Sequence, residues 1–294
     1  MTEIGNKPIH VGEMPVRTYS SDKSEYGIIQ TYKNLWREFP AAHSLGFSFT
    51  ERNIRARYRQ SVLGIFWAFL PPLVTTIIWI ILYNTKVVKI NDPGVPYPLF
   101  VITGTLLWSI FSNAILMPMQ TIQSNKTILV KLNFPREALL VNSFYEILFN
   151  VLIGSIIIVI AIIAFNVPVT FHSLLFFPSV LILMILGISL GLLLLPVSFL
   201  YKDIQFVMPS LLQFAMYLTP VVYAQPVYKG AAKILMLNPV SPVLTSARAW
   251  LLGLDTVFPL WQISAVAFVS VVLLLVGIFL QRITMQILIE RMGS

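Results

Sequence analysis

Long apolar runs separated by short polar segments dominate the chain. Six runs are each close to the roughly 20 residues that a helix needs to cross a bilayer. They cover residues 62–84, 97–118, 138–165, 171–200, 204–224 and 257–281. Segments this apolar must satisfy their backbone hydrogen bonds internally, and helices do so. The pattern therefore predicts an all-α membrane protein with six transmembrane helices.

Prolines lie inside several of these runs, at Pro71, Pro72, Pro196 and Pro209. A proline can kink a transmembrane helix without ending it, because neighbouring helices hydrogen-bond the freed carbonyls. We therefore expect kinks in the first, fourth and fifth spans.

The polar N-terminal region contains one amphipathic segment. Residues 27–39 place apolar side chains on one helical face and basic ones on the other, and Pro40 follows them. This predicts a short helix at the membrane interface that ends at Pro40; packing on a soluble partner is the alternative. Residues 1–26 lack periodicity and predict a flexible tail. The chain thus divides into this tail, an interface helix with a basic anchor at 27–61, and a transmembrane domain at 62–294.

A second unusual segment, residues 225–255, precedes the last span. Its two short apolar pieces, 231–237 and 243–254, flank a proline-containing turn, and neither is long enough to cross a bilayer. They predict a re-entrant helical hairpin received by protein or by a water-filled cavity. An ordinary loop with two surface helices is the alternative.

Composition and charge support this interpretation. The chain is 57% hydrophobic and 11% charged, whereas soluble domains are about 25% charged. The net charge of +8 does not indicate nucleic-acid binding, because the basic residues adjoin apolar runs. If the N-terminus is cytoplasmic, 15 Lys and Arg residues fall inside and 5 outside, so both termini are expected in the cytoplasm. The absence of cysteine excludes disulfides and thiolate sites.

Four arginines stand directly before the first span. As a group they are suited to anchor it on the cytoplasmic side. Helical spacing also places Arg52, Arg55 and Arg59 on one face, with Arg57 elsewhere. Guanidinium groups bind phosphate oxygens bidentately, so these three form a candidate site for the headgroup of a lipid-linked substrate. Both interpretations remain open.

The loop between the second and third spans is unusually apolar for a connection. Exposed apolar side chains favour contact with a partner protein, although dipping into the lipid interface is the alternative. The candidate contact residues are Lys126, Lys131, Leu132, Phe134, Pro135 and Arg136.

Polar residues within the spans are few. Asn142, Glu146 and Asn150 recur every four residues and form one face of the third helix. An intramembrane carboxylate is a functional candidate by default, and pairing with a basic residue or another helix is the structural alternative.

Aromatic residues are candidates for contact with sugar rings, because they offer amphipathic surfaces of low conformational entropy. On the first and fifth spans these are Phe66, Trp79, Phe214 and Tyr217. Core packing or lipid contact is the alternative for each of them.

Motifs for catalysis are absent from the sequence. It contains no G-x-x-x-x-G-K-[ST] phosphate loop, no H-E-x-x-H and no G-x-S-x-G, and its histidines are isolated. We therefore predict no catalytic or metal site in this chain.

Three segments together carry a resemblance to a known family. They read RNIRARYRQSVLGIFWAFLPPL at 52–73, LNFPREALL at 132–140 and YKDIQFVMPSLLQFAMYLTPVVY at 201–223. They resemble the membrane-spanning permease subunits of bacterial ABC transporters that export polysaccharides, including O-antigen, capsule and teichoic acid. Asn53 and Lys202 depart from the family pattern, where Asp and Arg are common.

The resemblance implies a channel-forming permease that exports a lipid-linked polysaccharide, most simply O-antigen, across the bacterial inner membrane. It implies a homodimer with two ATPase subunits, which would bind the ATP and Mg, and no cofactor in this chain. It also places a coupling helix for the ATPase at 119–136 and external gate helices before the last span. An ion-gradient-driven flippase and a membrane-embedded glycosyl- or acyltransferase are the alternatives.

Overall fold

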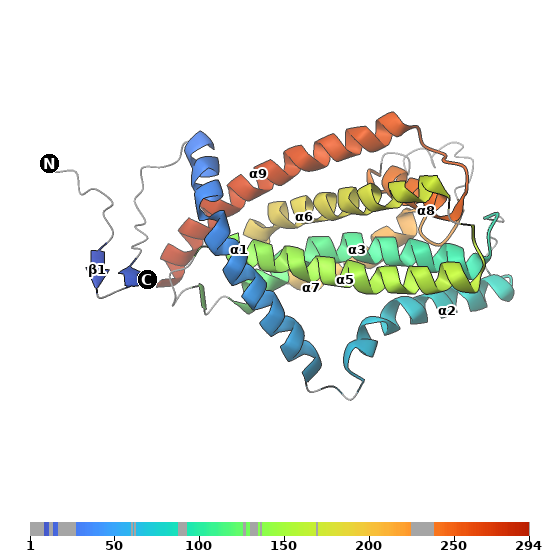
Figure 1. Ribbon diagram of the computed structural model, residues 1–294, viewed down its shortest axis with the longest axis horizontal. Helices are drawn as coiled ribbons and strands as arrows, with labels where there is room; N and C mark the ends of the chain where they lie inside the picture. The colour runs from blue at the N-terminus through green and yellow to red at the C-terminus, as the bar shows by residue number, and fades with distance from the viewer. Residues whose placement is uncertain are drawn as a thin grey trace.

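The computed structural model describes residues 9–11, 14–16, 28–59, 61, 63–87, 93–125, 128–129, 135, 137–168, 170–224 and 238–293. Long helices packed side by side dominate this part of the chain (Figure 1). The prediction of a helical membrane protein is confirmed. Within the predicted tail, the strands β1 (Ile9–Val11) and β2 (Met14–Val16) pair as a short antiparallel hairpin.

Four helical segments of the described residues are long and apolar enough to cross a membrane. They are α3 (Tyr97–Ser124), α5 (Glu137–Ala164), the segment Phe171–Leu200 that contains α6 (Phe176–Leu200), and the Leu260–Met285 part of α9 (Leu260–Gly293). Two shorter helices, α2 (Leu70–Asn84) and α7 (Asp203–Leu218), occupy the other two predicted runs. At 15 and 16 residues they fall short of the roughly 20 that a full span requires. The six-span count therefore stays a prediction.

The bundle has two distinct ends (Figure 1). α1 (Ile28–Arg59) crosses one of them, which we call the α1 end. The opposite end, which holds α8 (Val240–Leu252), we call the α8 end.

Helix α3 forms the centre of the bundle and contacts α2, α5, α6, α7 and α8. It lies very close to α6, because glycines on α6 face its backbone. A Cβ at Gly187 would lie 2.5 Å from the Cβ of Ala114, and one at Gly191 would lie 2.5 Å from the carbonyl oxygen of Ile115. Small residues four apart allow such approach between membrane helices. By contrast, only 17% of the apolar window of α9 is buried, so this helix lies at the periphery.

The N-terminal helix differs from the prediction. α1 runs from Ile28 to Arg59 with Pro40 inside it, so the predicted stop at Pro40 is wrong. A proline inside a helix costs roughly 3 kcal/mol, and tertiary contacts on both sides of it offset this cost. Before Pro40, Glu38 pairs with Arg282 of α9 at 3.2 Å. After Pro40, Gly46 lies directly against the α5 backbone. A Cβ added at Gly46 would lie only 2.6 Å from the carbonyl oxygen of Ala138.

The prediction that Pro71 and Pro72 kink the first span is also wrong. Both lie in the first turn of α2, where the backbone N–H groups have no acceptor within the helix and a proline removes nothing. Ahead of them, Gly64 has a φ of 52°, a left-handed conformation that glycine adopts without strain. The chain is redirected here, so that α1 and α2 meet in a V (Figure 1). The prolines predicted in the fourth and fifth spans do lie inside α6 and α7.

The region of the expected hairpin is partly described. α8 packs on α3 and α6 with most of its side chains buried, and Gly253 ends it with a φ of 68°. The other half of the expected hairpin, residues 231–237, lies outside the described residues. The re-entrant hairpin therefore also stays a prediction.

Candidate substrate-binding site

The three arginines proposed as a headgroup site share a helix but not their partners. Arg52 donates to the side-chain oxygen of Asn125 at 3.2 Å, at the end of α3. Arg55 pairs with Glu51 one turn earlier on α1, and both side chains are at least half exposed. Arg59 is exposed near the end of the helix. Arg55 and Arg59 are therefore exposed, whereas Arg52 also contacts the buried Asn125.

Arg57, which the sequence analysis set apart, forms an ion pair with a buried carboxylate. Its Nη2 lies 2.5 Å from Oε2 of Glu146 on α5. The amide of Asn53 donates to the other carboxylate oxygen at 2.9 Å. The Glu146 side chain is only 4% exposed, whereas that of Arg57 is 41% exposed. The intramembrane carboxylate is thus neutralised by α1, and the pair ties α1 to α5.

The other two members of the predicted polar face have different surroundings. Asn142 is fully buried, and its side-chain oxygen accepts a hydrogen bond from Thr50 of α1 at 2.9 Å. Its amide nitrogen has no partner among the described residues. Asn150 lines a cavity. The face therefore joins α1 to α5 at one end and borders open space at the other.

This cavity, which we call the α1–α2 cavity, has a volume of about 620 Å³. The ends of α1 and α2 that meet in the V form one side, and α3 and α5 form the other. Its polar lining outside α1 and the linker consists of Ser109, Asn113, Gln120 and Asn150. Sequence reasoning missed the three residues of α3, although their spacing places them on one helical face.

The predicted channel aromatics divide into two groups. Trp79 of α2 packs against Tyr217 of α7, with ring centroids 6.2 Å apart. Phe66 and Phe214 are 72% and 67% exposed, respectively, within a single chain. The first and fifth predicted spans therefore meet through one aromatic pair, and the remaining rings face outward.

The predicted partner-contact loop lies largely outside the described residues, which include Pro135 but not Lys126, Lys131, Leu132, Phe134 or Arg136. Leu129 is one of the apolar side chains of this loop, which the sequence analysis took to be exposed, and for Leu129 this is wrong. It is 4% exposed and belongs to a small hydrophobic cluster with Leu139, Leu195 and Met285. The start of the loop is therefore anchored to the bundle.

Sequence reasoning also missed a buried cation at the α8 end. Arg248 of α8 is 2% exposed, although the charge count had placed it in an external loop. Its Nη1 donates to the carbonyl oxygen of Val221 at 2.9 Å, and its Nη2 donates to that of Pro220. The guanidinium carbon lies 3.8 Å from the ring centre of Phe100 on α3. Among the described residues, Arg248 forms no ion pair, so carbonyl dipoles and an aromatic face compensate its charge.

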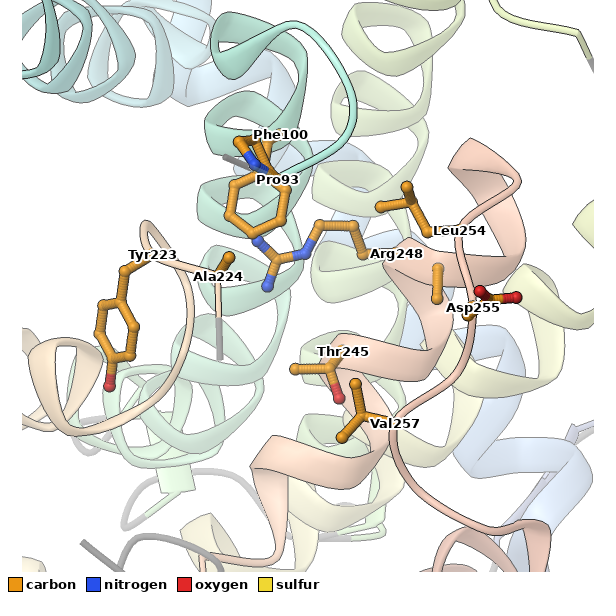
Figure 2. Close-up of a pocket in the computed structure, with 10 residues that line it drawn as sticks. Pro93, Phe100, Tyr223, Ala224, Thr245, Arg248, Leu254, Asp255 and Val257 are labelled. Atoms are coloured by element: carbon orange, nitrogen blue, oxygen red, sulfur yellow. The ribbon is translucent and has the colours of Figure 1, made fainter. Parts of the chain in front are cut away.

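The turn after α7 that supplies these carbonyls is held from several sides. Tyr97 of α3 donates to the carbonyl oxygen of Val222 at 3.0 Å. Asn238, just before α8, donates to the hydroxyl of Thr219 at 2.8 Å. Figure 2 shows the Arg248 guanidinium next to the Phe100 ring, where both residues line a smaller cavity of about 280 Å³. Side chains of α3 and α8 therefore fix the end of α7.

No group of three or more His, Asp or Glu side chains in the described part of the chain could hold a metal ion. His43 of α1 instead hydrogen-bonds Tyr145 of α5 at 2.7 Å, another contact between these two helices.

A bundle of helices this long and apolar indicates an integral membrane protein. Comparison with known families makes the assignment more specific. The model of the ABC-2 type transporter family matches residues 45–252, well over half of the chain. The chain belongs to this family.

Individual relatives carry a more specific name. The chain is 31% identical over 218 residues to the O-antigen export system permease protein RfbA of Myxococcus xanthus, covering 73% of this chain and 83% of the relative. Two proteins of the same name from Klebsiella pneumoniae are also similar. One is 21% identical over a match that covers 80% of this chain and 92% of the relative. The other is 28% identical over a shorter match that covers 33% of this chain and 39% of the relative.

Proposed function

We propose that this chain is the permease subunit of an ATP-driven exporter of lipid-linked polysaccharide, most simply O-antigen, in the bacterial inner membrane. The observation that carries the proposal is the similarity to the O-antigen export permease of Myxococcus xanthus over most of both chains. The α1–α2 cavity supports it, because polar side chains facing a cavity within a membrane mark substrate paths.

In the proposed assembly, two copies of the chain enclose the channel. α2 and α7 complete six spans per copy, both termini are cytoplasmic, and a hairpin at 225–255 closes the outer side. The exposed Phe66 and Phe214 support a channel or subunit contact here, since aromatic side chains that find no packing within one chain favour a partner surface. Trp79 and Tyr217 would join them along the sugar path.

The energy source in this proposal is a pair of separate ATPase subunits that bind ATP and Mg. The contact lies in the loop after α3, through Lys126, Lys131, Leu132, Phe134, Pro135 and Arg136. The anchoring of Leu129 in the bundle supports this role, because a coupling segment must pass force to the helices rather than move independently. Arg52, Arg55 and Arg59 would bind the phosphate headgroup of the substrate at the same side of the membrane.

The proposal is tested by co-expressing the chain with an ABC ATPase encoded beside it. We expect a stable complex whose vanadate-sensitive ATP hydrolysis rises when lipid-linked O-antigen is added. Cells that lack the chain should accumulate the polymer on the inner face of the membrane. A chain that purifies without an ATPase and moves substrate only while an ion gradient persists would instead identify a secondary flippase. Transfer of sugar or acyl groups by the purified chain would identify a transferase.

A further inference from the structure

We infer that the α1–α2 cavity binds a sugar ring of the lipid-linked substrate, through hydrogen bonds from its hydroxyls to amide side chains of α3 and α5. The inference rests on the proposed function and specifies which chemical part of the substrate this cavity takes. It assigns a role to Asn113, Gln120 and Asn150 and to the ion pair of Arg57 with Glu146.

The size of the cavity suits such a ligand. Its 620 Å³ lies within the range of about 300–1,000 Å³ typical of small-molecule sites. It equals the volume of about 20 water molecules, which is ample for a monosaccharide.

The electrostatics of the lining favour a neutral polar group over a phosphate. Among the residues that the structure describes, Arg57 is the one charged side chain that lines the cavity, and Glu146 neutralises it at 2.5 Å. A phosphate in the cavity would bring a further negative charge close to the buried Glu146 carboxylate, and like charges at such a site repel each other. Sugar hydroxyls carry no charge and avoid this repulsion.

The amide groups of the lining remain available for hydrogen bonds. Gln120 and Asn150 make no side-chain hydrogen bond to another described residue, and Asn113 uses one donor on Ser109 at 3.2 Å. An amide offers both donors and acceptors, as does a sugar hydroxyl. A saccharide can therefore satisfy these groups, whereas a lipid chain cannot.

The remaining walls suit the apolar faces of a sugar ring and its attached lipid. Trp67 and Tyr58 border the cavity together with Pro71 and Pro72, and aromatic rings offer flat amphipathic contact. The V of α1 and α2 projects from the side of the bundle (Figure 1). A ligand in the cavity could keep its lipid tail in the membrane, alongside the exposed Phe66.

The absence of cysteine from the chain allows a direct test by thiol labelling. Ser109→Cys replaces one atom and places a unique thiol in the cavity. Ser155→Cys is the matched control, because Ser155 is also partly buried on a bundle helix but does not line the cavity. Ser61→Cys adds a second reporter on the linker side. Each full-length variant is reconstituted in vesicles of phosphatidylcholine and phosphatidylglycerol and labelled with a small maleimide.

Two lipids with identical acyl chains then distinguish the possible occupants, namely glucosyl-diacylglycerol and phosphatidate. We expect the glycolipid to slow labelling at positions 109 and 61 by about threefold when its concentration is about twice its Kd. Phosphatidate should not slow it, and the control position should respond to neither lipid. Equal protection by both lipids would indicate a general lipid crevice, and stronger protection by phosphatidate would indicate a phosphate site. Either result overturns the inference, as does a thiol at 109 that never reacts or is never protected.

A second measurement uses the complex with its ATPase. Asn150→Leu removes the amide at similar volume and should raise the substrate concentration for half-maximal ATPase stimulation about tenfold, the loss expected for about 1.4 kcal/mol. Its maximal rate should not change, and Ser155→Ala should leave both values unchanged. Normal substrate stimulation in Asn150→Leu would reject the cavity site while leaving the proposed function intact. No stimulation even in the wild-type complex would reject the proposed function itself, on which this inference rests.

Discussion

Two arginines join helices at opposite ends of the bundle, and their charges are compensated differently. At the α1 end, Arg57 meets the carboxylate of Glu146. At the α8 end, Arg248 meets the carbonyl oxygens of Pro220 and Val221. The first contact is an ion pair with one side open to its surroundings, and in the second the cation directly contacts two carbonyl oxygens and a phenyl ring.

The difference determines what happens when a partner is lost. The Arg57 side chain is 41% exposed, so its charge can be hydrated if the carboxylate disappears. Arg248 is 2% exposed, and the carbonyls that it serves are buried with it. If the guanidinium is lost, water in the small cavity beside it is a neutral donor and replaces these two charge-assisted hydrogen bonds only in part. We therefore expect the fold to depend more on the α8 end, although the α1 end carries more charges.

Arg248→Met is expected to have the largest effect. It leaves two buried carbonyl groups without donors and removes the cation from the face of Phe100. Hydrogen bonds to charged groups contribute about 1.5–3 kcal/mol each, so the free energy of unfolding should fall by roughly 3–5 kcal/mol. Thermal unfolding in detergent micelles measures this.

Arg248→Lys serves as its control, because lysine keeps the charge but lacks the planar fork that reaches two carbonyls. Its loss should be intermediate. A loss below about 1 kcal/mol for the methionine variant would show that the two ends do not differ in the way argued here.

Gly104→Ala tests the same contact at the α8 end from α3, where Gly104 faces the Val221 carbonyl and Arg248. A Cβ at Gly104 on α3 would lie 2.1 Å from the carbonyl oxygen of Val221 and 3.2 Å from Nη1 of Arg248. Backbone must therefore shift, and overpacking of this kind costs about 1–3 kcal/mol. Gly154→Ala on α5 is the matched control, because its Cβ would meet only Leu106 at 3.5 Å. Equal melting temperatures for the two variants would contradict the tight contact at the α8 end.

The hydropathy pattern predicted α3, α5, α6 and α9 well, and the reason is physical. The bilayer acts on each residue of a span whatever its tertiary neighbours are, so length and apolarity suffice to locate it. The polar face at Asn142 and Glu146 was also predictable, since it depends only on helical spacing.

Features that depend on tertiary partners were not predictable. Pro40 looked like a helix end because local rules ignore the packing of α1 on α5 and the ion pair of Glu38 with Arg282 of α9. Arg248 looked like a loop charge because its acceptors, at Pro220 and Val221, lie 28 and 27 residues away, respectively. The polar residues of α3 were visible in the sequence. They line a cavity only because α1 and α2 meet in a V beside them, and the sequence pattern did not predict that arrangement.

Glu146→Gln, at the α1 end, should have a smaller effect than Arg248→Met. It leaves Arg57 without its carboxylate, while the glutamine can still accept from Asn53. Because Arg57 is partly exposed, we expect a loss of about 1–2 kcal/mol in unfolding free energy, below the 3–5 typical of fully buried pairs. The double variant Arg57→Gln with Glu146→Gln should recover part of this loss, because no uncompensated charge remains. A double variant as unstable as the sum of its single variants would show that the pair contributes nothing through its charges.

The smallest effect on stability is expected from replacing Arg52, Arg55 and Arg59 together by lysine. Arg55 and Arg59 are exposed, and the pair of Arg55 with Glu51 is a surface pair worth about 0.2–1 kcal/mol. Lysine keeps the positive charge, so topology, assembly and melting temperature should stay close to those of the wild type. A planar fork is lost, however, and with it bidentate contact to phosphate. If these arginines bind the substrate headgroup, stimulation of ATP hydrolysis by the substrate should weaken about tenfold for each 1.4 kcal/mol of binding free energy lost. Full stimulation in the triple variant would show that the three arginines serve only as a membrane anchor.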